Sequence, residues 1–163
     1  MRLRPGTDGL EGLPLKIAIV AVVMAISSPI IYGSLRAYEM GKLEGQMGSE
    51  ASAIAELAKM LYLGGPGNAQ QLTVNLRGGV TSSADYMLVG DTPDGTYESC
   101  ILYRVKGMAE KTLLIESPNV PLRAEREAPL KMLEGRHSLM LECKVGAWGQ
   151  YVEVRYAGWS ANI

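Results

Sequence analysis

The stretch from Ile17 to Tyr32 (IAIVAVVMAISSPIIY) constrains the fold most, because it contains no charged residue. With Leu13 and Leu15 before it, it reaches the roughly 20 residues that an α-helix needs to cross the hydrocarbon core of a bilayer. Lys16 lies near its N-terminal end, where a long side chain can extend its ammonium group to the interface. The stretch therefore predicts a membrane-length helix.

The helical pattern continues beyond Tyr32. Apolar residues recur at steps of three or four, the period of one helix face. They are Met40, Leu43, Met47, Ala51, Ile54, Ala58 and Leu61. We therefore expect one helix over residues 13–63, with a transmembrane half at 13–32 and an amphipathic half after it. The Gly-Gly-Pro-Gly-Asn run at 64–68 ends it.

The amphipathic half carries the candidate helix-packing residues. The Gly41-x-x-x-Gly45 spacing permits close approach of another helix. The apolar stripe either lies on the chain's own β domain, as amphipathic helices usually do, or contacts another subunit. The full candidate set is Met40, Gly41, Leu43, Gly45, Met47, Ile54 and Leu61.

After Asn68 the apolar pattern changes to period two, which is typical of strands. Leu139, Leu141, Cys143 and Val145 form its clearest run. The strands Tyr86–Val89 and Tyr97–Val105 are predicted to form a hairpin, and Ser117–Pro129 is predicted to be a long loop. Five to seven short strands are expected in a β domain at 68–163. The predicted fold class is α+β, a long N-terminal helix packed on a C-terminal antiparallel β-sheet or small β-sandwich.

Charge and composition disfavour several classes of function. From Leu63 onward, ten Lys and Arg residues are interspersed with eleven Asp and Glu residues, so no basic stripe predicts nucleic-acid binding. His137 is the single histidine, which excludes a multi-histidine metal site. No nucleophile elbow or P-loop is present. Asp85, Asp91 and Asp94 lack the ligand spacing of a calcium loop. We expect no catalytic residues, no metal, no cofactor and no enzymatic activity.

The two cysteines, Cys100 and Cys143, both fall in predicted strands. If this part of the chain lies outside the membrane, they are a candidate disulfide. The alternative is two small buried thiols. Trp148 and Trp159 lie near a turn and near the end of the sequence. We expect core or sheet-covering residues, with partner-binding anchors as the alternative.

The N-terminal segment allows three interpretations. Basic residues slightly exceed acidic ones before the apolar stretch, which favours a cytoplasmic start and an external β domain. The stretch is then a secretory signal cut near Ala25-Ile26-Ser27, an uncleaved single-pass anchor, or the helix of a pilin-type precursor. In the third case residues 1–12 are a charged leader, and cleavage on the cytoplasmic side leaves the helix in the mature protein.

The third interpretation rests on a resemblance. A short charged leader with Gly, an apolar helix that becomes amphipathic and a β-rich domain together resemble the type IV pilin superfamily. Asp8-Gly9-Leu10 and Glu11-Gly12-Leu13 resemble the processing sites of archaeal class III signal peptides. The resemblance implies that a prepilin peptidase cuts after one of the two glycines. The candidate processing residues are then Gly9, Leu10, Gly12 and Leu13.

The chain departs from the bacterial members in one respect. Bacterial type IV pilins carry a Glu at the fifth mature position. Cleavage after Gly9 would place Glu11 second, and cleavage after Gly12 would place Lys16 fourth.

The resemblance implies a structural role. The chain would be a major or minor subunit of an archaeal type IV pilus-like surface filament that serves in adhesion. Its helix would anchor it in the membrane and then form the filament core. Expected partners are the membrane and further copies of the chain or other pilin-like subunits. The alternative is a membrane-anchored extracellular β domain that does not polymerise and that binds the envelope or a partner protein, as an archaellum stator subunit does.

Overall fold

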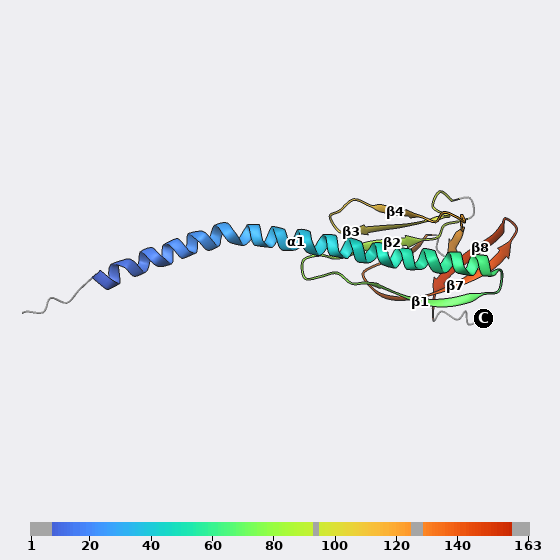
Figure 1. Ribbon diagram of the computed structural model, residues 1–163, viewed down its shortest axis with the longest axis horizontal. Helices are drawn as coiled ribbons and strands as arrows, with labels where there is room; N and C mark the ends of the chain where they lie inside the picture. The colour runs from blue at the N-terminus through green and yellow to red at the C-terminus, as the bar shows by residue number, and fades with distance from the viewer. Residues whose placement is uncertain (1–7, 93–94, 125–128, 158–163) are drawn as a thin grey trace, which may run out of the picture. The chain divides into compact units, whose positions relative to one another are not determined.

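The computed structural model describes residues 8–92, 95–124 and 129–157, with side chains from Pro14 onward. The chain divides into two compact units, Met1–Tyr38 and Glu39–Ile163, and each is described by itself. Helix α1, Asp8–Gly64, contributes to both units (Figure 1). The described strands lie in the second unit. The predicted α+β class is therefore confirmed.

Helix α1 ends where its sequence predicts. Gly65 follows Gly64 with a φ of +87°, a left-handed conformation that glycine adopts without steric strain and that commonly ends helices. The side-chain amide of Asn68 donates to the carbonyls of Gly64, at 2.7 Å, and Gly65, at 3.0 Å. These bonds satisfy acceptors that a helix end leaves without intrahelical partners. The start differs from the prediction, because the helix begins at Asp8, inside the segment predicted as a leader.

The second unit contains two four-stranded sheets, ordered β1-β7-β8-β5 and β4-β3-β2-β6. Five of the six strand pairs within them are antiparallel; the β5–β8 pair is parallel. The predicted hairpin is confirmed as the β2–β3 pair. The strands are β1 (Ala69–Leu76), β2 (Ala84–Val89), β3 (Cys100–Val105), β4 (Lys111–Leu114), β5 (Leu122–Ala124), β6 (Leu130–Met132), β7 (Gly135–Gly146) and β8 (Gly149–Tyr156).

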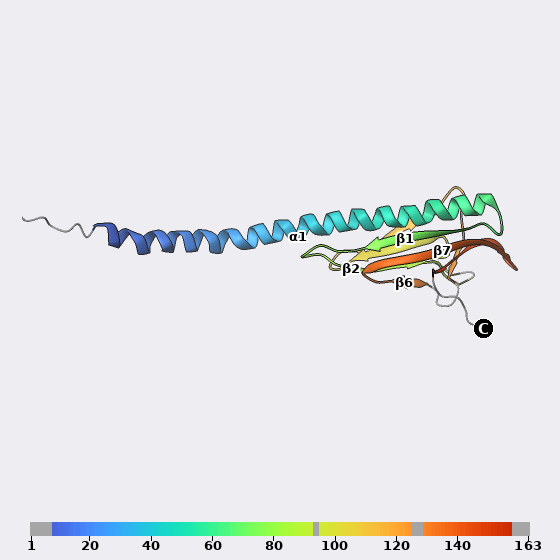
Figure 2. The ribbon, with the colours of Figure 1, turned by 90° about the horizontal axis from the view of Figure 1, so that it is seen from below.

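One hydrophobic core joins both sheets and the C-terminal part of α1. On β7, the period-two pattern places Leu139, Leu141 and Cys143 in this core with no exposed surface. Val145 continues the same pattern but is 63% exposed. It lies next to the turn that connects β7 and β8, where it pairs with Gln150. Figure 2 shows the C-terminal part of α1 running along the strands of this unit.

The segment Ser117–Pro129, predicted as a loop, contains strand β5, so this part of the prediction is wrong. β5 has three residues and pairs in parallel with β8. A strand this short shows no period in the sequence. It is fixed by distant backbone groups: Leu122 N–H donates to the Glu98 carbonyl at 2.6 Å, and Val152 N–H donates to the Pro121 carbonyl at 2.9 Å.

Arg123 on β5 links the two sheets through its side chain. Its Nε and Nη2 both lie 2.9 Å from Oε1 of Glu98, two residues before β3. Its guanidinium also stacks 4.5 Å from the ring centre of Tyr151 on β8. Both members of the ion pair are mostly buried, at 13% and 20% side-chain exposure. The charged hydrogen bonds therefore act with little screening and hold β5 in place.

Candidate functional site: the long helix and its surfaces

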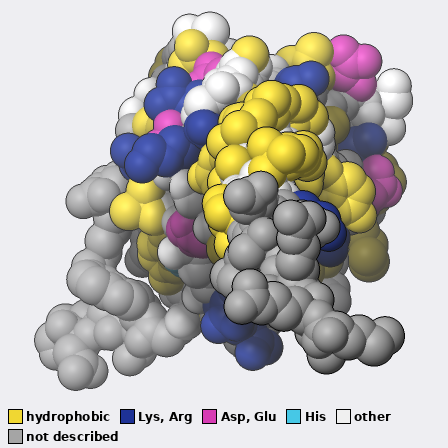
Figure 3. Space-filling view, turned by 90° about the vertical axis from the view of Figure 1, so that its left-hand side faces the viewer, with side chains coloured by type: hydrophobic (Ala, Val, Ile, Leu, Met, Phe, Trp, Pro, Cys, Tyr) yellow, Lys and Arg dark blue, Asp and Glu magenta, His cyan; other side chains and the backbone are white. Residues whose placement is uncertain are grey.

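The N-terminal part of α1 presents apolar side chains on every side. From Leu15 to Leu35 its large apolar side chains are 47–65% exposed, and an end-on view shows them gathered as one hydrophobic surface (Figure 3). Its most apolar 18-residue window has a mean hydropathy of 2.1, and none of that window is buried. The segment is thus long and apolar enough to cross a membrane. A secretory signal near an N-terminus has similar length and composition.

The polar groups within this segment are compatible with a dry environment. Ser28 donates its hydroxyl to the Met24 carbonyl at 2.7 Å, inside the helix. Pro29 follows within the helix and has no N–H, so the Ala25 carbonyl loses its usual intrahelical donor. Membrane helices tolerate such a proline where neighbouring groups satisfy the freed carbonyl.

The candidate helix-packing residues separate into two groups. Leu43, Met47, Ile54 and Leu61 are buried, with Met40 packed partly against the same core. This stripe therefore faces the chain's own sheets. Gly48 sits on the sheet side as well: a Cβ placed there would lie 3.0 Å from the Tyr103 hydroxyl. A larger residue at position 48 would push the helix or the tyrosine away.

The two glycines of the Gly41-x-x-x-Gly45 spacing do not share that face. Both are exposed, and a Cβ at either would meet no atom within 4 Å. They begin an exposed row of mostly small residues on the opposite side of the helix, which continues through Ser49, Ser52 and Glu56 to Met60 and Leu63. This outer face is open within a single copy of the chain.

The candidate processing residues Gly9, Leu10, Gly12 and Leu13 lie outside the residues whose side chains are described. Their backbone falls within the bounds of α1. Whether a peptidase cuts there stays a prediction.

The predicted disulfide is not formed; Cys100 and Cys143 are free and buried. Cys143 on β7 belongs to the core between the elements. Cys100 begins β3 in the other sheet, and its neighbour Ile101, rather than Cys100 itself, points into that core. The two thiols thus occupy different sheets and different sides of the core boundary. Sequence spacing carries no information on this arrangement, because it depends on which sheet each strand joins.

Both thiols should be unreactive while the protein is folded. Burial, together with the negative charge of Asp91, raises the pKa of Cys100, and the thiolate is the reactive form. We expect iodoacetamide at neutral pH to leave the folded chain unmodified and to add two groups after unfolding without reductant, as measured by intact mass. A chain that takes up no label when unfolded, but does so after reduction, would show that a disulfide exists.

The described residues contain no group of three or more His, Cys, Asp or Glu side chains that could hold a metal ion. His137 lies within β7, where its Nε2 is 2.7 Å from the Leu133 carbonyl oxygen. Its contacts are therefore those of a structural residue in a sheet.

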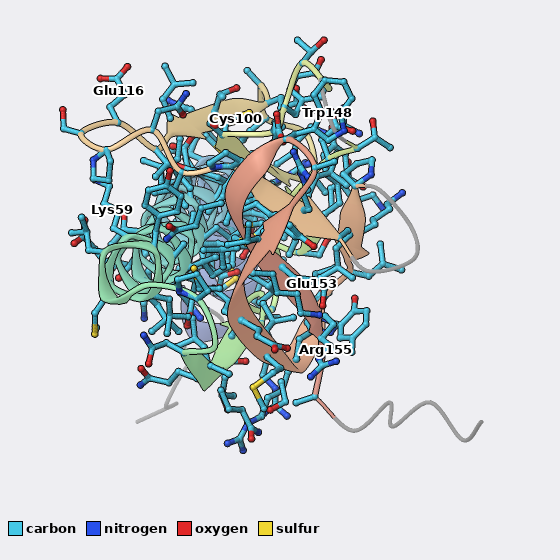
Figure 4. All side chains as sticks on the ribbon, turned by 90° about the vertical axis from the view of Figure 1, so that its right-hand side faces the viewer. Lys59, Cys100, Glu116, Trp148, Glu153 and Arg155 are labelled. Carbon is cyan, nitrogen blue, oxygen red and sulfur yellow. The ribbon has the colours of Figure 1, made fainter. Side chains whose placement is uncertain are left out.

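Two features were not anticipated from the sequence. Trp148 is 70% exposed in the turn between β7 and β8 (Figure 4), so its interpretation as a core or sheet-covering residue is wrong. Trp159 lies outside the described residues. The second feature is a contact between Glu39 on α1 and Thr81 in the β1–β2 loop. Residues 42 positions apart leave no local pattern by which this contact could be found.

Comparison with known proteins adds no identification. No protein-family model, no curated protein and no solved structure matches the chain.

Proposed function

We propose that the chain is a structural subunit of an archaeal type IV pilus-like surface filament. In this proposal α1 first anchors the protein in the membrane, with the β domain outside, and then packs with the helices of other subunits in the filament core. One observation carries the proposal: a single helix is apolar and exposed on every side in its first half and supplies core residues to a β domain in its second half.

The physical basis is that a bilayer and a packed helical core are both dry. A helix that is apolar all round can reside in either, and its backbone hydrogen bonds are satisfied internally in both. A subunit can therefore move from membrane to filament without exposing this surface to water. The open outer face that begins with Gly41 and Gly45 supports the same proposal, since small residues let neighbouring helices approach closely.

The second candidate is an anchored β domain that does not polymerise and binds the envelope or a partner protein. It is favoured by the lack of a Glu at the fifth mature position after either candidate cleavage site. It requires neither cleavage nor contacts between helices of different copies.

The proposal is tested first by sequencing the N-terminus of the protein isolated from native membranes and from shed surface filaments. We expect the mature chain to begin at Leu10 or Leu13. One of the variants Gly9→Val and Gly12→Val should accumulate as the unprocessed precursor, with filaments absent by electron microscopy; the other serves as its matched control. A chain that retains Met1 would support the non-polymerising anchor, and a start at Ser28 would mean ordinary secretion.

A further inference from the structure

The loop at residues 77–83, between β1 and β2, presents an apolar side chain to solvent. Val80, near its centre, is 95% exposed. No other described large apolar residue of the chain is as exposed; the next are Leu63 at 73% and Trp148 at 70%. A single exposed apolar residue is ordinary on protein surfaces. What distinguishes Val80 is how its loop is held and where it is attached.

The loop is fixed to α1 by a charged anchor. Oε2 of Glu39 accepts hydrogen bonds from both the backbone N–H and the hydroxyl of Thr81, each at 2.7 Å. On the other side of Val80, the N–H of Gly79 donates to the Ser82 hydroxyl oxygen at 3.1 Å, and the N–H of Gly78 donates to the Glu134 carboxylate at 3.1 Å. The loop is therefore bonded on both sides of Val80 while that side chain stays uncovered.

The two glycines allow this close attachment. A Cβ on Gly79 would lie 2.7 Å from Oε2 of Glu39, and a Cβ on Gly78 would lie 2.1 Å from the Ser82 carbonyl oxygen. A side chain at position 79 would displace the loop from the helix, and one at position 78 would disrupt the fold of the loop itself. The sequence thus keeps the loop against Glu39, with the valine directed away from the protein.

Glu39 follows closely after the membrane-length stretch. It is seven residues beyond Tyr32, and at 1.5 Å per residue the two positions are at most about 10 Å apart along the helix. This upper bound holds for any orientation of the two units. The headgroup layer occupies roughly 5–8 Å on each side of the hydrocarbon core. A loop bonded to Glu39 therefore lies at or next to the headgroup layer if the stretch spans a bilayer. Tyr38, 69% exposed, is of the residue type enriched at that level.

The charges at this end of the second unit fit an anionic lipid surface. The sheet register identifies the residues there: Arg136 pairs with Asn75 near the end of β1, and Lys106 N–H donates to the Ser83 carbonyl. At this end the exposed basic residues outnumber the exposed acidic residues, which are Glu110 and Glu134. The Glu39 carboxylate accepts hydrogen bonds from Thr81. The exposed basic residues are Lys42, Arg77, Lys106 and Arg136. Each basic residue near an anionic membrane surface favours binding.

We propose that the 77–83 loop is a lipid-contact site: Val80 contacts the headgroup layer, and the surrounding Lys and Arg side chains face anionic headgroups. The inference rests on the proposed membrane anchoring and does not require polymerisation. It gives the β domain a second point of contact with the bilayer, besides the helix itself.

The test uses the full chain in nanodiscs of phosphatidylcholine and phosphatidylglycerol, at one copy per disc. A polarity-sensitive fluorophore is attached to Val80→Cys, with Val23→Cys as the control inside the apolar stretch and Ala147→Cys, in the β7–β8 turn, as the exposed control at the other end of the sheets. The unsubstituted chain, treated identically, corrects for labelling of Cys100 and Cys143. Spin-labelled lipids then serve as contact quenchers.

We expect these lipids to quench the fluorophore at positions 80 and 23 at least twofold and to leave position 147 unchanged. Glu39→Gln should reduce quenching at position 80 alone and speed hydrogen exchange at the Thr81 amide, because the charged acceptor is lost. Quenching at 23 but not at 80 would overturn the lipid contact while leaving the anchor intact. A blue shift at 80 that appears only with several copies per disc would assign the loop to a contact between copies instead. Absence of quenching at 23 would refute the anchoring itself, and the lipid contact with it.

Discussion

Placing two arginines in the apolar stretch, as Val23→Arg with Ile26→Arg, should release the protein from the membrane. Both positions are near the middle of the stretch, and both side chains are more than half exposed, so the change leaves internal packing intact. Each arginine at the centre of a spanning helix opposes insertion by about 3 kcal/mol. The pair should therefore weaken membrane partitioning by roughly 10⁴-fold. Carbonate extraction of membranes, followed by immunoblotting of pellet and supernatant, measures the effect.

The same helix supplies a matched control. Met60 and Leu63 are also three residues apart and exposed, at 60% and 73%, but lie on the amphipathic half. Met60→Arg with Leu63→Arg adds the same charge and should leave the protein in the pellet. If the Val23 and Ile26 pair also remains resistant to carbonate, the apolar stretch is not the membrane anchor.

Ile54→Ala should destabilise the β domain strongly, although residue 54 lies on the helix. Its side chain has no exposed surface and belongs to the core shared with both sheets. Truncating a buried Ile leaves a cavity and lowers the free energy of unfolding by about 2–5 kcal/mol. The loss should appear as an earlier transition in denaturant unfolding of the detergent-solubilised chain, followed by the circular dichroism of the strands.

Met60→Ala is the control for that prediction, because Met60 is exposed on the outer face of the same helix. Its effect should stay within about 0.5 kcal/mol. Equal, small effects of both substitutions would mean that the helix does not complete the β core. The apolar stripe would then be free to face another subunit, as the alternative interpretation of the sequence holds.

The elements that the sequence predicts well are those with a strong local period. The uncharged stretch before Tyr32, the three-and-four spacing from Met40 to Leu61 and the alternation on β7 each record which side of one element is buried. The glycine run after Leu63 is equally local, because it marks a helix end through backbone conformation. These local features are sufficient to predict the α+β class without knowledge of any tertiary contact.

The sequence itself separates Gly41 and Gly45 from the apolar stripe. Successive helix residues are turned by about 100°, so Gly41 and Gly45, each two positions from Leu43, point to the side of the helix opposite Leu43. The spacing that defines the stripe thus already placed both glycines on the outer face. They remain candidates for helix packing, but against a partner outside the chain's own β domain.

Other features depend on contacts between distant segments. β5 exists because Leu122 bonds to Glu98, in the segment before β3, and Pro121 bonds to Val152 on β8, and three residues are too few to show a period. Whether Cys100 and Cys143 could pair depends on which sheet each strand joins, and the position of Val80 depends on a bond from Thr81 to Glu39. None of these is encoded in spacing along the chain. Trp148 is a different case. The glycines on either side of it indicate a turn, and a turn exposes its side chains. The prediction relied instead on the general tendency of aromatic residues to be buried.

The shared helix has a consequence for proteolytic shedding. Because Leu43 to Leu61 complete the core of the β domain, a protease that cuts after Gly64 would release a fragment lacking part of its own interior. A stable soluble fragment must begin near Glu39, so the releasing cut must fall within α1, before the buried stripe. Proteases cleave extended chain and reach helical backbone only after local unfolding. If the first half of α1 is a membrane anchor, its continuation as helix up to the buried stripe would protect the β domain from proteolytic release.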